Sequence, residues 1–228
     1  MPRRTPESRR ARPPRKSASP PLIPTTAPSP AVKTQTTEVP KEISDRLGPV
    51  VLRVFSSEDF HRVDMRSIAR EAGMSFATIY RYYHDKEALL FRFIDHWLQS
   101  LYPAALEPLY TDEPAPVRMK QVLLYTGEFY ERNPLVGRVI FMTVPLERWM
   151  KEQSFQQPEF ARLFIRTIRD GQRKGELRAD LAATDILDLY YGVFNRAFLM
   201  WDFRGRSYSL TDSIERLFDA ACEGIVPR

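Results

Sequence analysis

MRSIAREAGMSFATIYRYY, residues 65–83, has the layout of two short helices joined by a tight turn. The first helix ends at Gly73, a residue that readily adopts the left-handed conformation such a turn needs. Ser75 is placed to cap the second helix, which is predicted over Phe76 to about Tyr82. This arrangement is a helix-turn-helix, a motif whose second helix enters the major groove of DNA.

The residue types of the second helix divide between an inner and an outer face. Ile79 faces back toward Ile68 of the first helix, as a core position should. The outward positions carry hydroxyl groups and a guanidinium, on Thr78, Tyr80, Arg81 and Tyr82. Such groups suit phosphate oxygens, and Arg81 contacts either a guanine edge or phosphate alone. Lys86 places a positive side chain at the N-terminus of the next helix, which also favours a phosphate.

Helices continue on both sides of this motif. From Lys41 onward, apolar residues recur at the spacing of one helix face: Ile43, Leu47, Val50, Val51, Val54 and Phe55. Asp64 caps the first helix of the motif, and Asp85 caps a fourth helix that is predicted to extend to Leu101. His84, between them, is expected to be a turn residue rather than a pH switch. Four prolines then predict a break: Pro103, Pro108, Pro114 and Pro116.

The rest of the chain also has helical periodicity. The predicted helices are Val117–Arg132, Pro134–Val144, Glu147–Lys151, Pro158–Lys174, Ala183–Phe203 and Leu210–Gly224. No run shows sustained alternation of period two, so no sheet is expected. The sequence therefore predicts an all-α fold.

Charge and proline are concentrated at the start of the chain. Residues 1–40 contain eight Lys and Arg and ten of the nineteen prolines, and they carry a charge of +6 against +5 for the whole chain. The remaining residues are therefore close to neutral, and the basic character belongs to this segment. Without hydrophobic periodicity it cannot form a packed core, so a disordered basic arm is predicted. The arm either adds sequence-independent attraction to phosphates or serves only as a solubilising tail.

Composition excludes several other classes of protein. Cys222 is the single cysteine, and the three histidines are too few for a Cys/His zinc cluster, so neither a disulfide framework nor a metal or other cofactor is expected. No apolar run is long enough to span a membrane. A reducing cytoplasmic location is the natural expectation. Residues 102–228 contain no histidine and no motif of an activated nucleophile, which argues against an enzyme.

Residues 68–89, IAREAGMSFATIYRYYHDKEAL, resemble the signature of the tetracycline-repressor (TetR) family. The resemblance in motif covers about residues 42–101. It implies an all-helical homodimer with an N-terminal three-helix DNA-binding head at 41–101, including the helix-turn-helix at about 64–83. A C-terminal ligand-binding and dimerisation domain at 102–228 would follow. Asp59 departs from the pattern, because the family usually has a glycine there.

The resemblance also implies roles for single residues. Thr78, Tyr80 and Lys86 match family positions that touch phosphates. Other matched positions commonly reach bases or backbone, and the predicted DNA-binding set is Arg66, Ser75, Phe76, Thr78, Tyr80, Arg81, Tyr82 and Lys86. Asp64 stands where the family usually opens the helix with Thr or Ser, and its carboxylate would repel a phosphate.

The C-terminal domain is rich in aromatic residues, most of which are expected to be core. In this resemblance it should also contain an apolar cavity, and the predicted lining is Tyr125, Phe129, Phe141, Met142, Phe164, Tyr190, Phe194 and Asn195. No glycine-rich phosphate cradle is present, so the expected effector is hydrophobic or aromatic. The last two helices are expected to form the dimer interface through Leu187, Leu189, Tyr191, Ile214, Leu217, Phe218 and Ala221, or to use part of that surface within the chain.

The leading hypothesis is therefore a sequence-specific DNA-binding transcriptional regulator in the bacterial cytoplasm, associated with the nucleoid. It is expected to be a repressor that a hydrophobic small molecule releases from its operator. A dimer reads a two-fold-related site, so the operator should be a palindrome of double-stranded DNA. Two alternatives stay open: a helical enzyme, and a protein-interaction module with a vestigial DNA-binding head.

Overall fold

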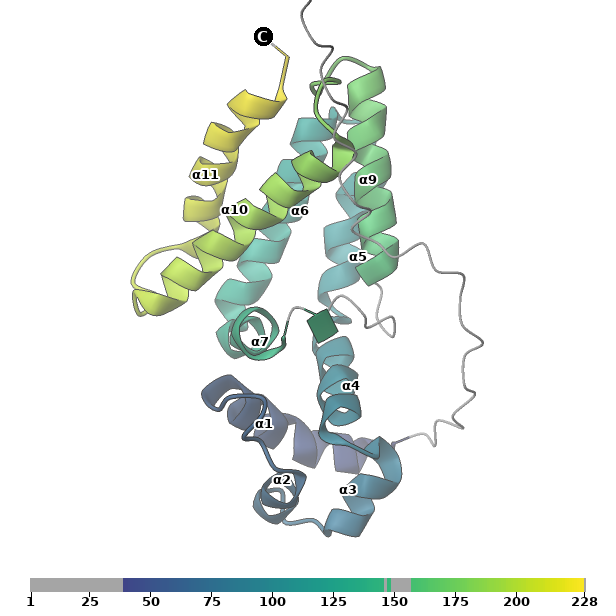
Figure 1. The fold of residues 1–228 in the computed structure, drawn as a ribbon, viewed down its shortest axis with the longest axis vertical. Coiled ribbons are helices and arrows are strands. Elements are labelled where there is room, and N and C mark those ends of the chain that lie inside the picture. The colour runs from purple at the N-terminus through teal and green to yellow at the C-terminus, as the bar shows by residue number, and fades with distance from the viewer. Residues whose placement is uncertain (1–38, 146, 149–156, 228) are drawn as a thin grey trace, which may run out of the picture. The chain divides into compact units, whose positions relative to one another are not determined.

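The computed structural model describes residues 39–145, 147–148 and 157–227 (Figure 1). Of the predicted arm, residues 1–38 lie outside this part of the chain, as does most of the predicted helix 147–151. The described residues form one compact unit. Within the described residues every regular element is helical, which confirms the all-α prediction.

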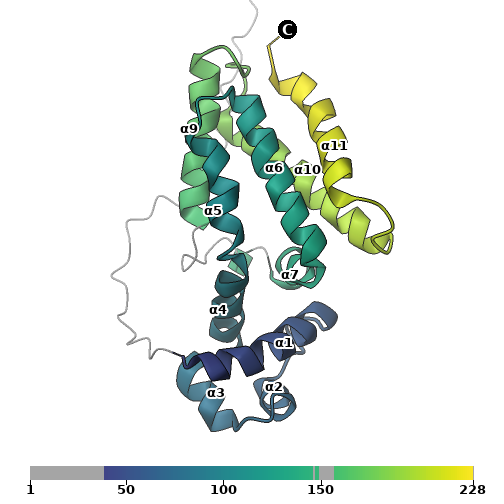
Figure 2. The same cartoon turned by 180° about the vertical axis from the view of Figure 1, so that it is seen from behind.

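Four helices build the N-terminal part, which we call the head: α1 (Lys41–Ser57), α2 (Met65–Glu71), α3 (Phe76–Tyr83) and α4 (Lys86–Leu98). Figure 2 shows α1 lying across α2, α3 and α4. The shared core contains the fully buried side chains of Leu47 and Phe55 from α1, Ile68 from α2, and Ile79 from α3. These are the positions that the helical periodicity assigns to the inner faces.

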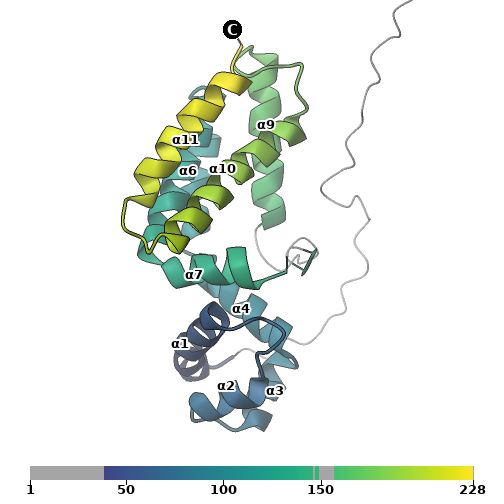
Figure 3. The same cartoon turned by 60° about the vertical axis from the view of Figure 1, so that its left-hand side comes forward.

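The remaining helices form what we call the body: α5 (Leu101–Leu106), η1 (Glu107–Tyr110), α6 (Ala115–Arg132), α7 (Pro134–Arg138), η2 (Val139–Thr143), α9 (Gln157–Arg173), α10 (Ala183–Phe203) and α11 (Leu210–Ile225). Helix α6 packs against α5 and α11, while α10 packs against α9 and α11 (Figure 3). The predicted helix Pro134–Val144 is present, but its second half is the π-helical turn η2. No helix in the described ranges is long and apolar enough to cross a membrane.

The helical break that four prolines predict is present only at residues 111–114, between η1 and α6. Helix α4 ends at Leu98, and the chain continues into α5 and the 3-10 helix η1. Pro103 and Pro108 lie in the first turns of these two elements, while Pro114 is the N-cap of α6 and Pro116 lies in its first turn. The first turn of a helix contains N–H groups that have no partner within the helix, so a proline there loses nothing. These prolines therefore begin helices.

Two carboxylates cap helices that are distant in the sequence. Glu131 on α6 accepts hydrogen bonds from the backbone N–H of Leu210, at 2.7 Å, and from the hydroxyl of Thr211, at 2.6 Å, at the start of α11. Glu176 accepts a 2.8 Å hydrogen bond from the backbone N–H of Ala115 at the start of α6. A negative charge is stabilising at a helix N-terminus. These contacts hold the helices of the body in register.

Candidate nucleic-acid interface

The turn between α2 and α3 has the predicted geometry, and it is also stabilised by hydrogen bonds that the sequence did not predict. Gly73 has a φ of +62°. The carboxylate of Asp64 accepts hydrogen bonds from the backbone N–H groups of Arg66 and Ser67, so Asp64 is the N-cap of α2. In addition, Arg46 on α1 donates to the carbonyls of Ala72 and Gly73, at 2.9 and 2.7 Å. A cation at a helix C-terminus is favourable, and here it ties the turn to α1.

Helix α3 is held by its cap and by two buried residues. The hydroxyl of Ser75 accepts a 3.0 Å hydrogen bond from the backbone N–H of Thr78, as the sequence predicts. Ile79 is fully buried. Tyr83 is also buried, with its ring stacked on that of Phe93 at 6.0 Å, and burial raises the pKa of its hydroxyl. These contacts leave the opposite face of α3 free.

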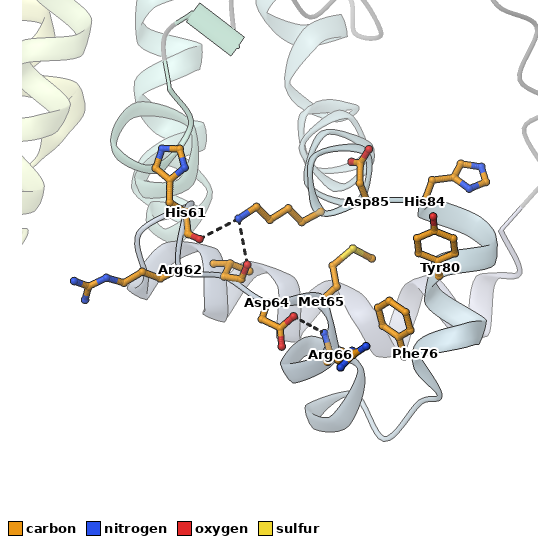
Figure 4. Close-up of a pocket in the computed structure, with 11 residues that line it drawn as sticks. His61, Arg62, Asp64, Met65, Arg66, Phe76, Tyr80, His84 and Asp85 are labelled. Atoms are coloured by element: carbon orange, nitrogen blue, oxygen red, sulfur yellow. Dashed lines mark hydrogen bonds between the residues drawn. The ribbon is translucent and has the colours of Figure 1, made fainter.

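The free face of α3 carries a row of aromatic side chains. Phe76 and Tyr80 expose 39% and 51% of their surfaces, and their ring centroids are 5.7 Å apart. Tyr80 makes an edge contact with the ring of His84, and the guanidinium of Arg66 lies 5.6 Å from the centroid of Phe76. Large exposed aromatic residues on one face indicate a binding surface. Figure 4 shows Arg66, Phe76 and Tyr80 side by side.

The remaining predicted contacts of α3 are placed beside this row. Arg81 is exposed, and its guanidinium lies 4.9 Å from the ring centroid of Tyr82 and donates a 3.2 Å hydrogen bond to the Tyr82 hydroxyl. The hydroxyls of Ser75 and Thr78 are 2.7 Å apart. Arg81 therefore rests on a neighbouring ring, where its planar group is oriented and its other donors remain available. The roles of these residues in binding DNA stay predictions.

Lys86 forms hydrogen bonds that could not be predicted from its position in the sequence. Its ammonium donates to the carbonyls of Phe60, His61 and Val63, at 2.8, 3.2 and 3.3 Å, and lies 4.7 Å from the ring centroid of Phe60. An ammonium has three donors, and all three point at the loop between α1 and α2. In this structure Lys86 thus holds that loop, so a phosphate would have to compete with these carbonyls.

A shallow groove of about 380 Å³ runs between the α1–α2 loop and α3, and Lys86 and Arg66 border it (Figure 4). Arg62, which sequence reasoning missed, also lines it and is exposed. The two carboxylates of the groove, Asp64 and Asp85, accept hydrogen bonds from helix N-termini, so their negative charge is partly offset. The groove therefore combines cations with exposed aromatic rings, a combination that suits nucleic acid.

Two sequence expectations about turn residues have clear outcomes. His84 ends α3 with a φ of +54°, which confirms it as a turn residue. Asp59 has no positive φ, although it stands where a glycine was expected from the resemblance. Instead its carboxylate accepts a 3.0 Å hydrogen bond from the backbone N–H of His61. This side-chain turn replaces the conformational freedom of glycine.

The residues predicted to line a cavity in the body fall into three groups. Phe129, Phe141 and Phe194 join one aromatic cluster around Tyr130. Phe164 and Tyr190 pack on each other at 4.3 Å in a second cluster. Tyr125, Met142 and Asn195 are exposed. That these residues line a cavity stays a prediction, and the two aromatic clusters would form its apolar part.

The comparisons with known proteins agree with this geometry. Residues 51–93 match the model of the family described as bacterial regulatory proteins, tetR family. The HTH-type transcriptional regulator UidR of Escherichia coli strain K12 is 26% identical over 147 residues, which are 61% of this chain and 74% of UidR.

Solved structures share the fold. The fatty acid degradation regulator FadR from Bacillus halodurans has a TM-score of 0.67 at 15% identity and covers 80% of this chain and 95% of its own. A tetR-family transcription regulator from Shewanella sp. PV-4 has a TM-score of 0.66 at 20% identity, covering 82% and 99%. FadR from Bacillus subtilis, solved in complex with stearoyl-CoA, has a TM-score of 0.65 at 16% identity, covering 79% and 98%.

Proposed function

We propose that the chain is a DNA-binding transcriptional regulator of the tetR type, and that it is a repressor that a hydrophobic small molecule releases from a palindromic operator. The observation that carries the proposal is the free face of α3, where Phe76 and Tyr80 are exposed next to Arg66. A helix of this kind reads base edges in a major groove while neighbouring hydroxyls and cations contact phosphates. The site of action is then the nucleoid, in the bacterial cytoplasm.

The proposal includes a homodimer, because two recognition helices are needed to read a two-fold-related site. Of the residues expected at the interface, Leu187, Ile214 and Phe218 are buried within the chain and cannot contribute a free surface. Leu189 and Leu217 are exposed on α10 and α11. Gly192 on α10 and Gly224 on α11 have no atom close to the position of an added Cβ, so another helix could approach these surfaces closely. These residues support α10 and α11 as the interface.

Two of the contacts between the body and the head support release of DNA by a molecule bound in the body. In η2, Phe141 packs on Tyr130 in the body, while the hydroxyl of Thr143 donates a 2.7 Å hydrogen bond to the carbonyl of Phe55 in α1. A shift of the aromatic cluster would therefore displace η2 and, through this hydrogen bond, α1. An effector can change the affinity for DNA by no more than the difference between its own affinities for the two arrangements of these contacts.

The second contact joins the segment after η2 to the groove. Arg148 forms an ion pair with Glu87 at the start of α4, and its guanidinium lies 5.4 Å from the ring centroid of Phe60. Arg148 and Lys86 thus both lie near the ring of Phe60. For the chemical class of effector, the apolar clusters of the body support a hydrophobic molecule, as does the stearoyl-CoA held by the Bacillus subtilis FadR that shares this fold.

The test is selection of bound sequences from a random DNA pool, followed by titration of the enriched sequence at two salt concentrations. We expect an enriched palindrome bound by two copies of the chain. Tyr80→Ala and Arg81→Ala should each weaken discrimination against a mismatched base by about 1–3 kcal/mol, or roughly 5- to 150-fold. Arg204→Ala removes an exposed arginine from the α10–α11 loop and is the matched control.

Binding without preference for any sequence would refute the proposed readout. Turnover of a small molecule by the purified chain would favour the enzyme alternative. Specific DNA binding that survives the loss of both Tyr80 and Arg81 would show that another surface reads the operator.

A further inference from the structure

Arg118 on α6 is the one charged residue that is buried in the described part of the chain, and it exposes only 6% of its surface. Its neighbours on the same face of the helix, Ala115 and Val122, are fully buried. An ion in apolar surroundings is costly unless an opposite charge accompanies it. No carboxylate of the described residues forms an ion pair with Arg118.

The hydrogen-bond donors of the Arg118 guanidinium are also mostly unused. Nη1 donates to the carbonyl of Leu109 in η1 over 3.4 Å, which is long for such a bond. Nε is fully enclosed and has no partner. Nη2 has no acceptor among the described residues and, unlike Nε, is not fully enclosed. One edge of the guanidinium, formed by Nε and Nη2, therefore has two donors without acceptors, and such buried groups in native structures call for an explanation.

Two other arginines of the body show what this edge of Arg118 lacks. Arg178 donates from Nε and Nη2 to the two carboxylate oxygens of Asp180, at 3.0 and 2.6 Å. Arg138 also has an enclosed Nε without a partner, but its Nη1 lies 3.7 Å from the carboxylate of Asp202. Arg118 therefore presents the edge that binds a carboxylate in Arg178, and no described residue supplies the carboxylate.

The acidic residues around the start of α6 do not pair with Arg118. Glu176 accepts a 2.8 Å hydrogen bond from the backbone N–H that begins α6, and it lies 4.0 Å from the ammonium of Lys174. Asp112 and Glu113, which precede α6, are exposed. The negative charge that would balance Arg118 must then come from a bound molecule.

We propose that Arg118 binds the carboxylate of the effector, so that the body takes an apolar molecule with an acid group at one end. The proposal rests on the ligand-binding role given to the body above. A carboxylate matches the planar edge of a guanidinium with two parallel hydrogen bonds and supplies the missing negative charge. Because Nε is enclosed, the second of these bonds requires the atoms that cover it to shift. The residues around Arg118 are apolar, so the rest of the molecule is expected to be apolar as well.

Two naphthalene derivatives of nearly equal size provide the test: 1-naphthylacetate, which has a carboxylate, and 2-(1-naphthyl)ethanol, which has a hydroxyl. Their affinities for the full chain are measured in the absence of DNA by isothermal titration calorimetry. We expect the acid to bind more tightly than the alcohol, and the ratio of their affinities to fall about 10- to 150-fold in Arg118→Met, the size of one hydrogen bond to a charged group. Arg118→Lys keeps the charge without the planar edge and should keep part of the preference. Arg204→Met, which removes an exposed arginine from the α10–α11 loop, should leave the ratio unchanged.

The melting temperature without ligand separates a binding role from a structural one. Because Arg118 has no ion pair to lose, Arg118→Met should melt at or above the temperature of the wild-type chain. A lower melting temperature would show that the bond to Leu109 is structural, and it would overturn the proposal.

Sodium acetate tests whether a small anion alone satisfies the site. Acetate that binds as tightly as 1-naphthylacetate, an equal ratio of acid to alcohol affinity in all variants, or failure of both naphthalene compounds to bind would also overturn the proposal. If the acid binds through Arg118 and DNA binding does not respond, the inference stands and the proposed release by an effector fails.

Discussion

Lys86 offers a direct test of whether the loop between α1 and α2 is held from α4. Replacing it by methionine keeps an unbranched side chain of similar length and removes the ammonium. The carbonyls of Phe60, His61 and Val63 then lose their shared donor. The loop positions Asp64, the N-cap of α2, so its loosening should lower both the stability of the head and its affinity for DNA.

The expected loss follows from the three distances. A hydrogen bond to a charged group contributes about 1.5–3 kcal/mol, and the 2.8 Å contact with Phe60 is the one of normal length in a partly buried setting. The contacts with His61 and Val63 are longer, at 3.2 and 3.3 Å, and the first of them is exposed to solvent. The contact of the Lys86 ammonium with the Phe60 ring adds about 0.5–1 kcal/mol. We therefore expect the free energy of unfolding to fall by about 3 kcal/mol in total. For a chain of this size the melting temperature should fall by about 6–12 °C.

The assay is thermal unfolding followed by circular dichroism, together with DNA titrations over a range of salt. Lys41→Met is the control, because the Lys41 side chain is 85% exposed and forms a surface ion pair with Asp45 one turn away. Such a surface pair contributes about 0.3–0.5 kcal/mol, so the control should melt within about 2 °C of the wild-type chain. If Lys86→Met melts normally and the slope of log affinity against log salt drops by about 0.9, then Lys86 binds a phosphate and our account of the loop is wrong.

Two further predictions concern the body. Gly137→Ala would place a Cβ 2.3 Å from Cζ of the fully buried Phe198 ring, so we expect a loss of about 1–3 kcal/mol in urea unfolding, and an unchanged midpoint would show that the ring moves without cost. Burial raises the pKa of Tyr130 and Tyr190 well above 10, so their contribution to stability is complete below pH of about 10 and is lost as the pH rises further. Absorbance at 295 nm should therefore show that part of the tyrosine ionisation occurs only with the loss of helical circular dichroism, and ionisation of all ten tyrosines in a chain that stays helical would contradict this.

The local features of the head could be predicted because their causes lie within a few residues. Asp64, Ser75 and Asp85 each accept a hydrogen bond from an N–H two or three positions later, which is the spacing that defines a helix cap. Gly73 and Ile79 follow in the same way, from the turn between helices and from the period of 3.6 residues. The four prolines predicted a break longer than the observed residues 111–114, because the sequence alone does not distinguish a proline that begins a helix from one that follows its end.

By itself, the sequence determined the helical class, the helix-turn-helix with its caps, and the exposed aromatic and basic residues of α3, since periodicity and capping are properties of neighbouring residues. Only the tertiary structure decided what Lys86 and Arg46 hold, because each binds carbonyls more than twenty positions away. The same is true of Glu131, whose partners are about eighty residues distant. Such contacts depend on how helices pack in three dimensions, and no pattern along the chain records that packing.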